Sequence, residues 1–322
     1  MTASEFVLTS AAKMRAAAIL GLSASEKDLR PFQKESDVTW ATGVPASSTE
    51  ADAILIFGGD GTVHRHLAQL VKLQLPVLIV PCGSGNDFAR ALNLRSTRDA
   101  LEAWREFVSG RGNVRQIDLG VITPSDAGGA PAPHNPAPGN YFCCVGGVGL
   151  DAEVARRANR LPRALRRRGG YLLSLLPALF RFQPVAVEVA SPANLFSGFQ
   201  THYSGTAMLV AFANTPTFGG GLRIAPGAQF DDGRLEVCVV SAMAKSRLLR
   251  LFPSVYSGAH VKFPEVKYFQ AERLRIAAEP PSDVYADGEY VCSTPVEVKL
   301  ERAALKVIVP ESQTSIDKNG RT

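Results

Sequence analysis

Two glycine-rich segments carry residue types that could bind phosphate groups. The first, FGGDGTVH, covers 57–64, and the second, PCGSGNDFAR, covers 81–90. Glycine lacks a Cβ atom, so backbone N–H groups can approach a phosphate, and a helix that begins after the loop adds a favourable dipole. Asp60 would repel phosphate unless a cation lay between them, so the pattern favours phosphate with Mg²⁺. For a lone GGDG segment, a tight strand-to-helix turn with Asp60 as an N-cap is the simpler interpretation.

Two carboxylates near the end of the chain could accept a proton from a hydroxyl group. Asp287 and Glu289 stand in YADGEY, at 285–290, and phosphoryl transfer to an alcohol uses a carboxylate in this way. Asp-Gly between apolar stretches is also the strongest short-range hairpin signal. Both interpretations can hold, because a hairpin tip that faces a cleft can carry a base. FDDG at 230–233 is as easily a type I turn as a metal-binding loop.

Apolar runs precede both glycine-rich segments. The runs at 16–20, 51–57 and 75–81 predict buried strands, and 63–73 and 87–94 have helical periodicity. Strands that alternate with helices predict an open parallel α/β sheet. Loops at the carboxyl ends of neighbouring parallel strands meet in one crevice, the usual ligand site of such a sheet. Two such loops therefore favour a nucleotide, although neither a P-loop nor a dinucleotide fingerprint is present.

The second half of the chain has a different pattern of apolar residues and turn residues. A Pro-, Ala- and Gly-rich interval at 123–140 predicts an exposed loop. Beyond it, β-branched runs between turn clusters predict an antiparallel β domain, with one helix at 246–258 broken at Pro253. A length of 322 residues suits two domains. We predict a nucleotide-binding domain at 1–118 and a β-rich domain at 119–302, with 303–322 able to pack back on the first.

The excess positive charge of the chain is concentrated in one segment. The segment 151–170 holds seven arginines against two acids, which leaves 28 basic and 28 acidic residues elsewhere. An apolar stretch at 171–180 follows it, and this combination is typical of a segment on an anionic membrane surface. A solvated basic helix is the equal alternative, and nucleic acid is not favoured. The arginines are Arg156, Arg157, Arg160, Arg163, Arg166, Arg167 and Arg168.

The cysteine pattern and the lengths of the apolar runs predict where in the cell the protein is located. The five cysteines show no CxxC spacing, so we expect reduced core thiols in a cytoplasmic protein that associates peripherally with membrane. No secretion signal is visible, and the apolar stretch at 171–180 is ten residues long, about half of the ~20 needed to span a bilayer. A homodimer is left open.

Together these motifs resemble the diacylglycerol kinase catalytic family, a group of lipid kinases that includes sphingosine and ceramide kinases. GGDGT at 58–62 and PxGxxNDFAR at 81–90 carry the resemblance. The second is the more specific, since NAD kinases and phosphofructokinases share a GGDG loop but lack NDFAR. The resemblance continues through YFCCVGGVGLDAEV at 141–154, PGAQFDDGRLEV at 226–237 and YADGEY at 285–290.

The resemblance implies a fold, a reaction and a set of roles. The fold is an NAD kinase- or phosphofructokinase-like α/β domain followed by an antiparallel β-sandwich. The reaction moves the γ-phosphoryl of ATP to a lipid hydroxyl, diacylglycerol-like, with Mg²⁺. Asp287 would be the general base, and Glu289 would join Asp60 and Asp87 in the Mg²⁺ and water network. Asp232 would bind a second, structural Mg²⁺ with the backbone carbonyls of Gln229 and Arg234. The residues implied at ATP and its Mg²⁺ network are Gly58, Gly59, Asp60, Gly61, Thr62, Gly83, Ser84, Asn86 and Asp87.

The chain departs from the family at three places. The segment 16–32 has no Asn-Pro where the family has an NPxSG loop that contacts nucleotide. His64 replaces the commoner Asn, and we expect it in the first turn of a helix rather than as a ligand. Tyr290 follows DGE, where Pro is frequent. Two alternatives stay open: a same-fold kinase for a non-lipid alcohol, and a non-catalytic nucleotide or lipid sensor.

Overall fold

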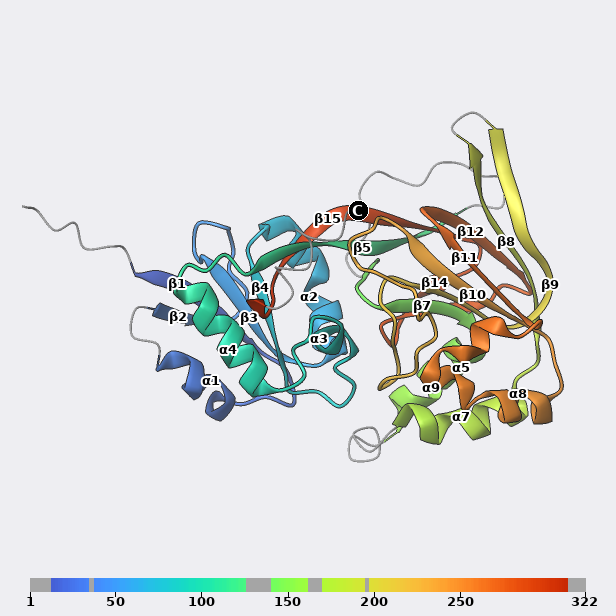
Figure 1. The fold of residues 1–322 in the computed structure, drawn as a ribbon, viewed down its shortest axis with the longest axis horizontal. Coiled ribbons are helices and arrows are strands. Elements are labelled where there is room, and N and C mark those ends of the chain that lie inside the picture. The colour runs from blue at the N-terminus through green and yellow to red at the C-terminus, as the bar shows by residue number, and fades with distance from the viewer. Residues whose placement is uncertain (1–12, 35–37, 126–139, 162–169, 195–196, 312–322) are drawn as a thin grey trace, which may run out of the picture.

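The computed structural model describes residues 13–34, 38–125, 140–161, 170–194 and 197–311. An α/β part and a β-rich part lie side by side and share one continuous sheet (Figure 1). Strands β2, β1, β3 and β4 are parallel neighbours in that order, which confirms the predicted parallel sheet. The elements of the α/β part are β1 (Met14–Leu20), α1 (Glu26–Gln33), β2 (Val38–Thr42), β3 (Ala53–Gly58), α2 (Asp60–Leu73), β4 (Val77–Pro81), α3 (Asp87–Ala91) and α4 (Thr97–Val108).

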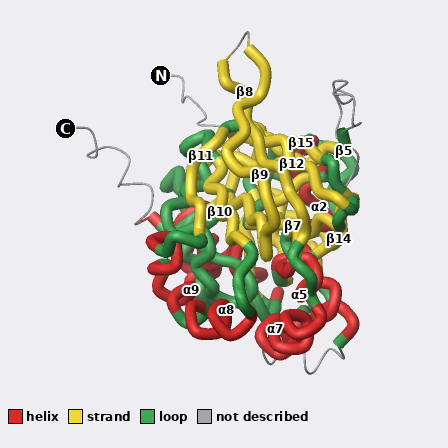
Figure 2. Tube along the Cα trace, turned by 90° about the vertical axis from the view of Figure 1, so that its right-hand side faces the viewer, coloured by secondary structure: helices red, strands yellow, loops and turns green. Residues whose placement is uncertain are grey.

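The β-rich part is built from antiparallel pairs. Val, Leu, Ile and Phe side chains from its strands form a buried core between the sheet layers, as alternation along half-buried strands predicts. The helices of this part gather at one end of the strands (Figure 2). The elements are β5 (Val114–Pro124), β6 (Tyr141–Phe142), β7 (Val145–Gly149), α5 (Leu150–Arg160), α7 (Gly170–Arg181), β8 (Val185–Asn194), β9 (Ser197–Ala213), β10 (Leu235–Ser241), α8 (Lys245–Leu251), α9 (Ser254–Ser257), η1 (Ala259–Lys262), β11 (Val266–Ala271), β12 (Arg273–Glu279), β13 (Asp283–Ala286), β14 (Glu289–Ser293) and β15 (Val296–Ile308).

The last strand links the two parts. β15 pairs antiparallel with β5 from Val296 to Ile308 and with β12 at its start, and near its end Val307 also aligns in parallel with Val77 of β4. β5 and β15 therefore cross the middle of the molecule together (Figure 1). The predicted domain limits stay predictions, but β15 itself contributes to both parts.

The sequence patterns located most elements near the site. Strand β3, helix α2 and strand β4 lie where the apolar runs predict them, and the four residues Ile54–Phe57 have an exposed fraction of 0%. Full burial of such side chains contributes about 1.5–3 kcal/mol each. The predicted helix at 246–258 is interrupted at Pro253, between α8 and α9. Most of the predicted loop at 123–140 lies outside the described residues.

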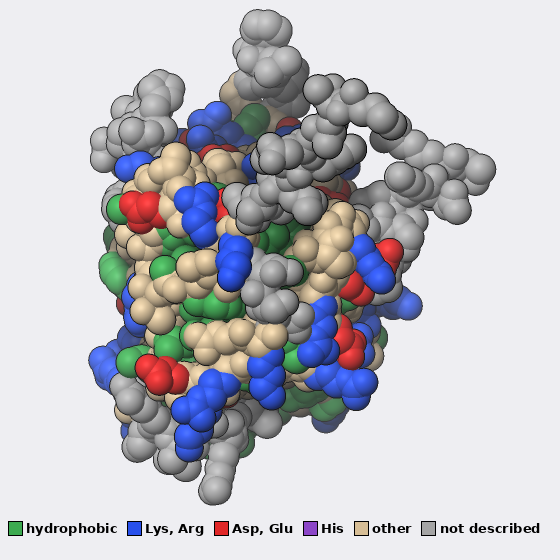
Figure 3. All heavy atoms as spheres, turned by 90° about the vertical axis from the view of Figure 1, so that its left-hand side faces the viewer, with side chains coloured by type: hydrophobic (Ala, Val, Ile, Leu, Met, Phe, Trp, Pro, Cys, Tyr) green, Lys and Arg blue, Asp and Glu red, His purple; other side chains and the backbone are tan. Residues whose placement is uncertain are grey.

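Two surface properties bear on the predicted location. Among the described residues, no helix combines the length and apolar character needed to cross a bilayer. On the face formed by the α/β part, Lys and Arg side chains are scattered among uncharged and acidic ones (Figure 3). The net charge of +5 is therefore not collected into one block on that face.

Candidate active site

The two glycine-rich loops touch each other. A Cβ atom on Gly83 would lie 2.5 Å from the Cα atom of Gly59, so neither loop has room for a side chain there. Asn86 fixes the second loop, because its Oδ1 accepts a hydrogen bond from the N–H of Gly83 at 2.9 Å and its Nδ2 donates to the Gly83 carbonyl at 2.9 Å. Asn86 has a φ of 55°, a conformation that Asn tolerates better than most residues.

Asp60 joins the first loop to the helix after the second. Its Oδ2 accepts a hydrogen bond from the backbone N–H of Asp87 at 3.1 Å, and its Oδ1 accepts one from Phe88 at 3.0 Å. Asp60 therefore caps α3, while Gly59 is the N-cap of its own helix, α2. Burial, and then the nearby Asp87 carboxylate, raise the pKa of Asp60 to about 6.

Asp87 connects the α/β part to the β-rich part. Its side chain is buried, Oδ1 accepts from Arg90 Nη1 at 2.7 Å, and Oδ2 accepts from the backbone N–H of Gly220 at 2.8 Å. Burial outweighs these donors and raises the pKa of Asp87. Two carboxylates with raised pKa values, one buried and one partly buried, thus stand at the edge of the same crevice.

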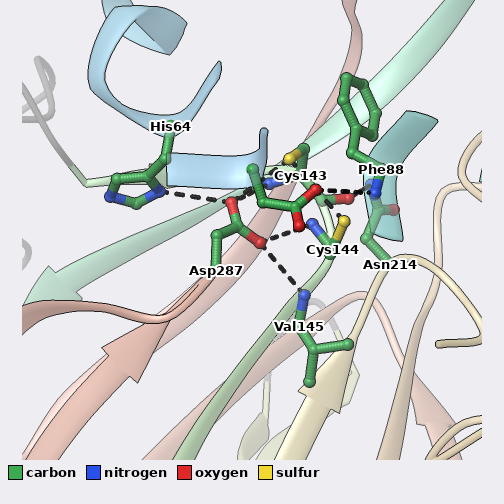
Figure 4. Close-up of polar contacts among 8 residues, drawn as sticks. His64, Phe88, Cys143, Cys144, Val145, Asn214 and Asp287 are labelled. Carbon is green, nitrogen blue, oxygen red and sulfur yellow. Dashed lines mark hydrogen bonds and ion pairs between the residues drawn. The ribbon is translucent and has the colours of Figure 1, made fainter. Parts of the chain in front are cut away.

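The Asp-Gly pair forms the predicted hairpin and also faces the crevice. Asp287 and Gly288 have φ values of 50° and 85°, as a type I′ turn between β13 and β14 requires. The Asp287 side chain points inward with an exposed fraction of 0%. Its Oδ2 accepts from the N–H of Cys143 and its Oδ1 from that of Cys144, both at 2.8 Å (Figure 4).

His64 lies against Asp287, although 223 residues separate the two in sequence. It lies on α2, its Nδ1 is 3.3 Å from Asp287 Oδ2, and its side chain is 7% exposed (Figure 4). Burial lowers the pKa of His64, but the hydrogen bond and charge of Asp287 outweigh that effect and raise it. Burial likewise raises the pKa of Asp287, but His64 and the backbone donors prevail and lower it. The two groups stabilise each other's charged forms.

A polar pocket opens between the two parts of the molecule at these loops. Gly58 and Asn86 do not line it. Gly58 ends strand β3, and Asn86 holds the second loop through Gly83. The pocket also includes Ser23, Arg65 and Asp151, which the sequence did not identify as site residues. Arg65 stands one turn after the first loop, and Asp151 belongs to the GLDA segment. Their positions beside these motifs could therefore have identified both as site residues. The predicted residues that line the pocket are Gly59, Asp60, Gly61, Thr62, Gly83, Ser84, Asp87, Asp287 and Glu289.

Comparisons with known proteins agree with this geometry. A model of the diacylglycerol kinase catalytic domain matches residues 13–122, and one of the YegS C-terminal NAD kinase beta sandwich-like domain matches 145–309. A diacylglycerol kinase of Mycobacterium tuberculosis is 34% identical over 265 residues, covering 80% of this chain and 77% of its own length. The chain belongs to the diacylglycerol kinase catalytic family. It is a kinase that phosphorylates an alcohol acceptor.

Further relatives extend the comparison. The diacylglycerol kinase of Bacillus subtilis is 26% identical over 273 residues, covering 83% of this chain and 81% of its own. A diacylglycerol kinase crystal structure from Bacillus anthracis has a TM-score of 0.68 at 20% identity, covering 94% and 98% of the two chains. An NAD kinase from Archaeoglobus fulgidus in complex with ATP has a TM-score of 0.53 at 14% identity, covering 93% and 95%. These structures confirm the predicted fold.

An apolar pocket of this kinase adjoins the polar one. Its walls come from α7, α8 and the loop before β10, and leucine, phenylalanine, valine and methionine side chains form nearly all of the lining. Asp151 and Phe218 line both pockets. A hydroxyl held near Asp151 would therefore lie between a polar chamber and an apolar one.

The predicted metal loop lies away from the polar pocket. Asp232 Oδ1 accepts a hydrogen bond from the N–H of Arg234 at 2.9 Å, so the segment does form a tight turn. Burial, and then the carboxylates of Asp231 and Asp118, raise the pKa of Asp232. The Arg302 guanidinium packs over Gly233, where a Cβ atom would lie 2.4 Å from Cζ. The structural Mg²⁺ at Asp232, with Gln229 and Arg234, stays a prediction.

Proposed function

We propose that this protein is an ATP- and Mg²⁺-dependent lipid kinase that phosphorylates the hydroxyl group of a diacylglycerol-like acceptor at a membrane surface. The observation that carries the proposal is the junction of the two pockets at Asp151 and Phe218. A phosphate donor needs polar walls and backbone donors, whereas acyl chains need apolar walls. A lipid alcohol has its hydroxyl at the junction of such regions.

The nucleotide end of the proposal is supported by the polar pocket. The N-terminus of α2, a helix of 14 residues, faces it together with Arg65, and both favour the phosphates of ATP. The pocket wall contains the carboxylates of Asp60, Asp87 and Glu289. Mg²⁺ is usually held by one or two carboxylates plus substrate phosphates, so this set fits the ion. When bound, Mg²⁺ would offset the charge of the phosphates.

The general base is proposed to be Asp287, with Glu289 as its neighbour at the pocket. The lowered pKa keeps the Asp287 carboxylate ionised at neutral pH. A weak base of this kind is sufficient, because a loose phosphoryl-transfer transition state requires little removal of the hydroxyl proton. Glu289 is exposed, and a Cβ atom on Gly61 would lie 3.1 Å from its Oε1. Glu289 is therefore close to the first loop and able to reach a cation there.

The membrane part of the proposal is supported mainly by α7. Leu173, Leu176 and Phe180 on this helix are 53%, 50% and 64% exposed, beside the apolar pocket that α7 partly lines. Arg156 and Arg157 of α5 both pair with Glu153, which reduces their charge toward an anionic surface. Arg160 is also on α5. The other arginines of the predicted patch, Arg163, Arg166, Arg167 and Arg168, lie outside the described residues.

The proposal is tested with labelled ATP and a panel of acceptors. Diacylglycerol, sphingosine and ceramide are offered in mixed micelles, and soluble alcohols in buffer. Phosphorylation of a lipid alone supports the proposal, whereas phosphorylation of a soluble alcohol alone identifies a same-fold kinase for a non-lipid acceptor. ATP binding without turnover on any acceptor would point to a sensor. Product formation that persists in Asp287→Asn removes Asp287 as the base and directs attention to Glu289.

A further inference from the structure

Two adjacent cysteines and a carboxylate meet beside the polar pocket, where Cys144 and Asp287 line the wall and Cys143 is buried behind it. One ligand atom from each of Cys143, Cys144 and Asp287 lies within 4.8 Å of the other two. We infer that these three side chains form a binding site for a thiophilic divalent cation, with Zn²⁺ as its best-fitting occupant. This inference concerns metal binding and does not depend on which acceptor the kinase uses.

The backbone places both sulfur atoms on the same side. In a regular strand, successive side chains point to opposite faces of the sheet. β6 ends at Phe142 and β7 begins at Val145, so Cys143 and Cys144 lie in a bend between strands. The two Sγ atoms are 3.9 Å apart, close enough to bind one ion together.

Two of the three ligand separations match a tetrahedral zinc site. With Zn–S bonds of ~2.3 Å and a Zn–O bond of ~2.0 Å, tetrahedral angles separate two sulfur ligands by ~3.8 Å and a sulfur from an oxygen by ~3.5 Å. The Cys143 and Cys144 sulfurs are 3.9 Å apart, and Cys143 Sγ lies 3.3 Å from Asp287 Oδ2. These two separations need shifts of only a few tenths of an ångström, and Cys144 Sγ lies within 4.8 Å of the carboxylate. The fourth position is left for water.

The ligand types select a soft cation over Mg²⁺. Thiolates favour Zn²⁺, whereas Mg²⁺ favours carboxylates, phosphates and water. Cys144 and Asp287 both line the polar pocket, which gives an ion a route from solvent. Burial raises the pKa of Cys144 to about 12 and that of Cys143 as well, so the ion must displace two protons and binds better in mildly alkaline buffer.

Metal binding is tested first on the unmodified full chain, with all thiols reduced. Co²⁺ is used as the spectroscopic probe, and we expect a thiolate-to-Co²⁺ charge-transfer absorption that Zn²⁺ abolishes and excess Mg²⁺ leaves unchanged. Absence of that absorption, or its loss to Mg²⁺, would overturn the inference. This measurement needs no variant, so it stands even where a substitution impairs folding.

The ligands are then assigned with single substitutions. Zn²⁺ affinity is measured by competition with a chromogenic chelator, and one ion is expected per chain. Cys143→Ala and Cys144→Ala are each expected to weaken binding by more than about 100-fold, since loss of a ligand exceeds loss of an outer partner. Cys292→Ala removes a half-buried thiol outside the cluster and should leave affinity unchanged. Equal affinity in all three variants overturns the inference, and circular dichroism confirms that each is folded.

Discussion

The carboxylate of Asp118, on β5, accepts a hydrogen bond from the backbone N–H of Ala303, on β15, at a distance of 2.8 Å. Its other oxygen accepts from the N–H of Gly233, also at 2.8 Å. Ala303 has a φ of 51°, and the register of β5 against β15 shifts between Glu301 and Leu305. Asp118 thus holds the irregular point at which β15 passes from one part of the molecule to the other.

Removal of this acceptor should destabilise the fold. Asp118→Ala leaves two N–H groups without their partner, and we expect the free energy of unfolding to fall by about 2–4 kcal/mol. Urea denaturation measures the change. The control is Glu102→Ala, which breaks an exposed pair with Arg98 on α4 and should cost less than about 0.5 kcal/mol. Equal losses in the two variants would contradict the role of Asp118.

The His64–Asp287 pair should make stability depend on pH. The raised pKa of His64 gives stabilisation that is complete below its ordinary value of 6.5 and is lost as the pH rises through the folded value. The lowered pKa of Asp287 gives stabilisation that is complete above its ordinary value of 3.8 and is lost as the pH falls. His64→Asn should therefore cost most between these two values, by about 1–3 kcal/mol.

Denaturation of the wild type and of His64→Asn at mildly acidic and at alkaline pH measures this difference. Glu289 also acts on His64 through its charge, so Glu289→Gln should reduce the effect without abolishing it. His66→Asn, on the same helix, is the matched control. A cost that stays constant with pH would show that His64 acts by packing alone.

Arg65 is expected to contribute to nucleotide affinity. It lines the polar pocket one turn into α2, and a charge-assisted hydrogen bond to phosphate contributes about 1.5–3 kcal/mol. Arg65→Ala should raise the dissociation constant for ATP by about 10-fold or more, as measured by calorimetry, with an unchanged melting temperature. Arg98→Ala, on α4, serves as the control. Unaltered ATP affinity would remove Arg65 from the phosphate site.

The loop at 229–234 offers a test of its predicted structural Mg²⁺. If the ion binds the folded state, Mg²⁺ at ten times its dissociation constant stabilises the protein by about 1.4 kcal/mol. Thermal melts should then show a rise with Mg²⁺ in the wild type and no rise in Asp232→Asn. The same melts in nucleotide-free buffer with a chelator give the baseline. A wild type that does not respond would indicate that Arg302, which packs against this loop, supplies the positive charge instead.

Vesicle binding should depend on α7. Phe180 is 64% exposed, and Phe180→Ser removes apolar area worth about 25 cal/mol per Å² in a membrane interface. Sedimentation with anionic vesicles should show a several-fold loss of binding, with ATP affinity unchanged. Phe199→Ser, which alters an exposed ring on β9, is the control. Equal binding by all three proteins would leave α7 as a solvated face.

The sequence predicted the structural features that depend on a few neighbouring residues. The glycine loops, the Asp-Gly hairpin and the break at Pro253 follow from backbone preferences of a few neighbouring residues. Strand β2 has a partly exposed, mixed sequence, so no apolar run marks it.

Contacts between distant segments had no local signal. Asp60 lies in a loop that predicts an N-cap, yet it caps a different helix, because its direction depends on how α3 docks beside α2. Likewise, nothing near His64 indicates that it meets Asp287. These relationships arise from the order of strands in the sheet and from the arrangement of its two parts.

The position of β15 also sets an order of events during synthesis. The edge of β4 gains its partner only when residue 307 has been made, after every other strand of the described structure. Until then the β4 edge of the nascent chain has unpaired backbone N–H and C=O groups, and such an edge can pair with strands of other chains. The N-terminal sheet is therefore completed only after both parts of the described structure have been made, and a fragment cut between them lacks a strand that pairs with β4.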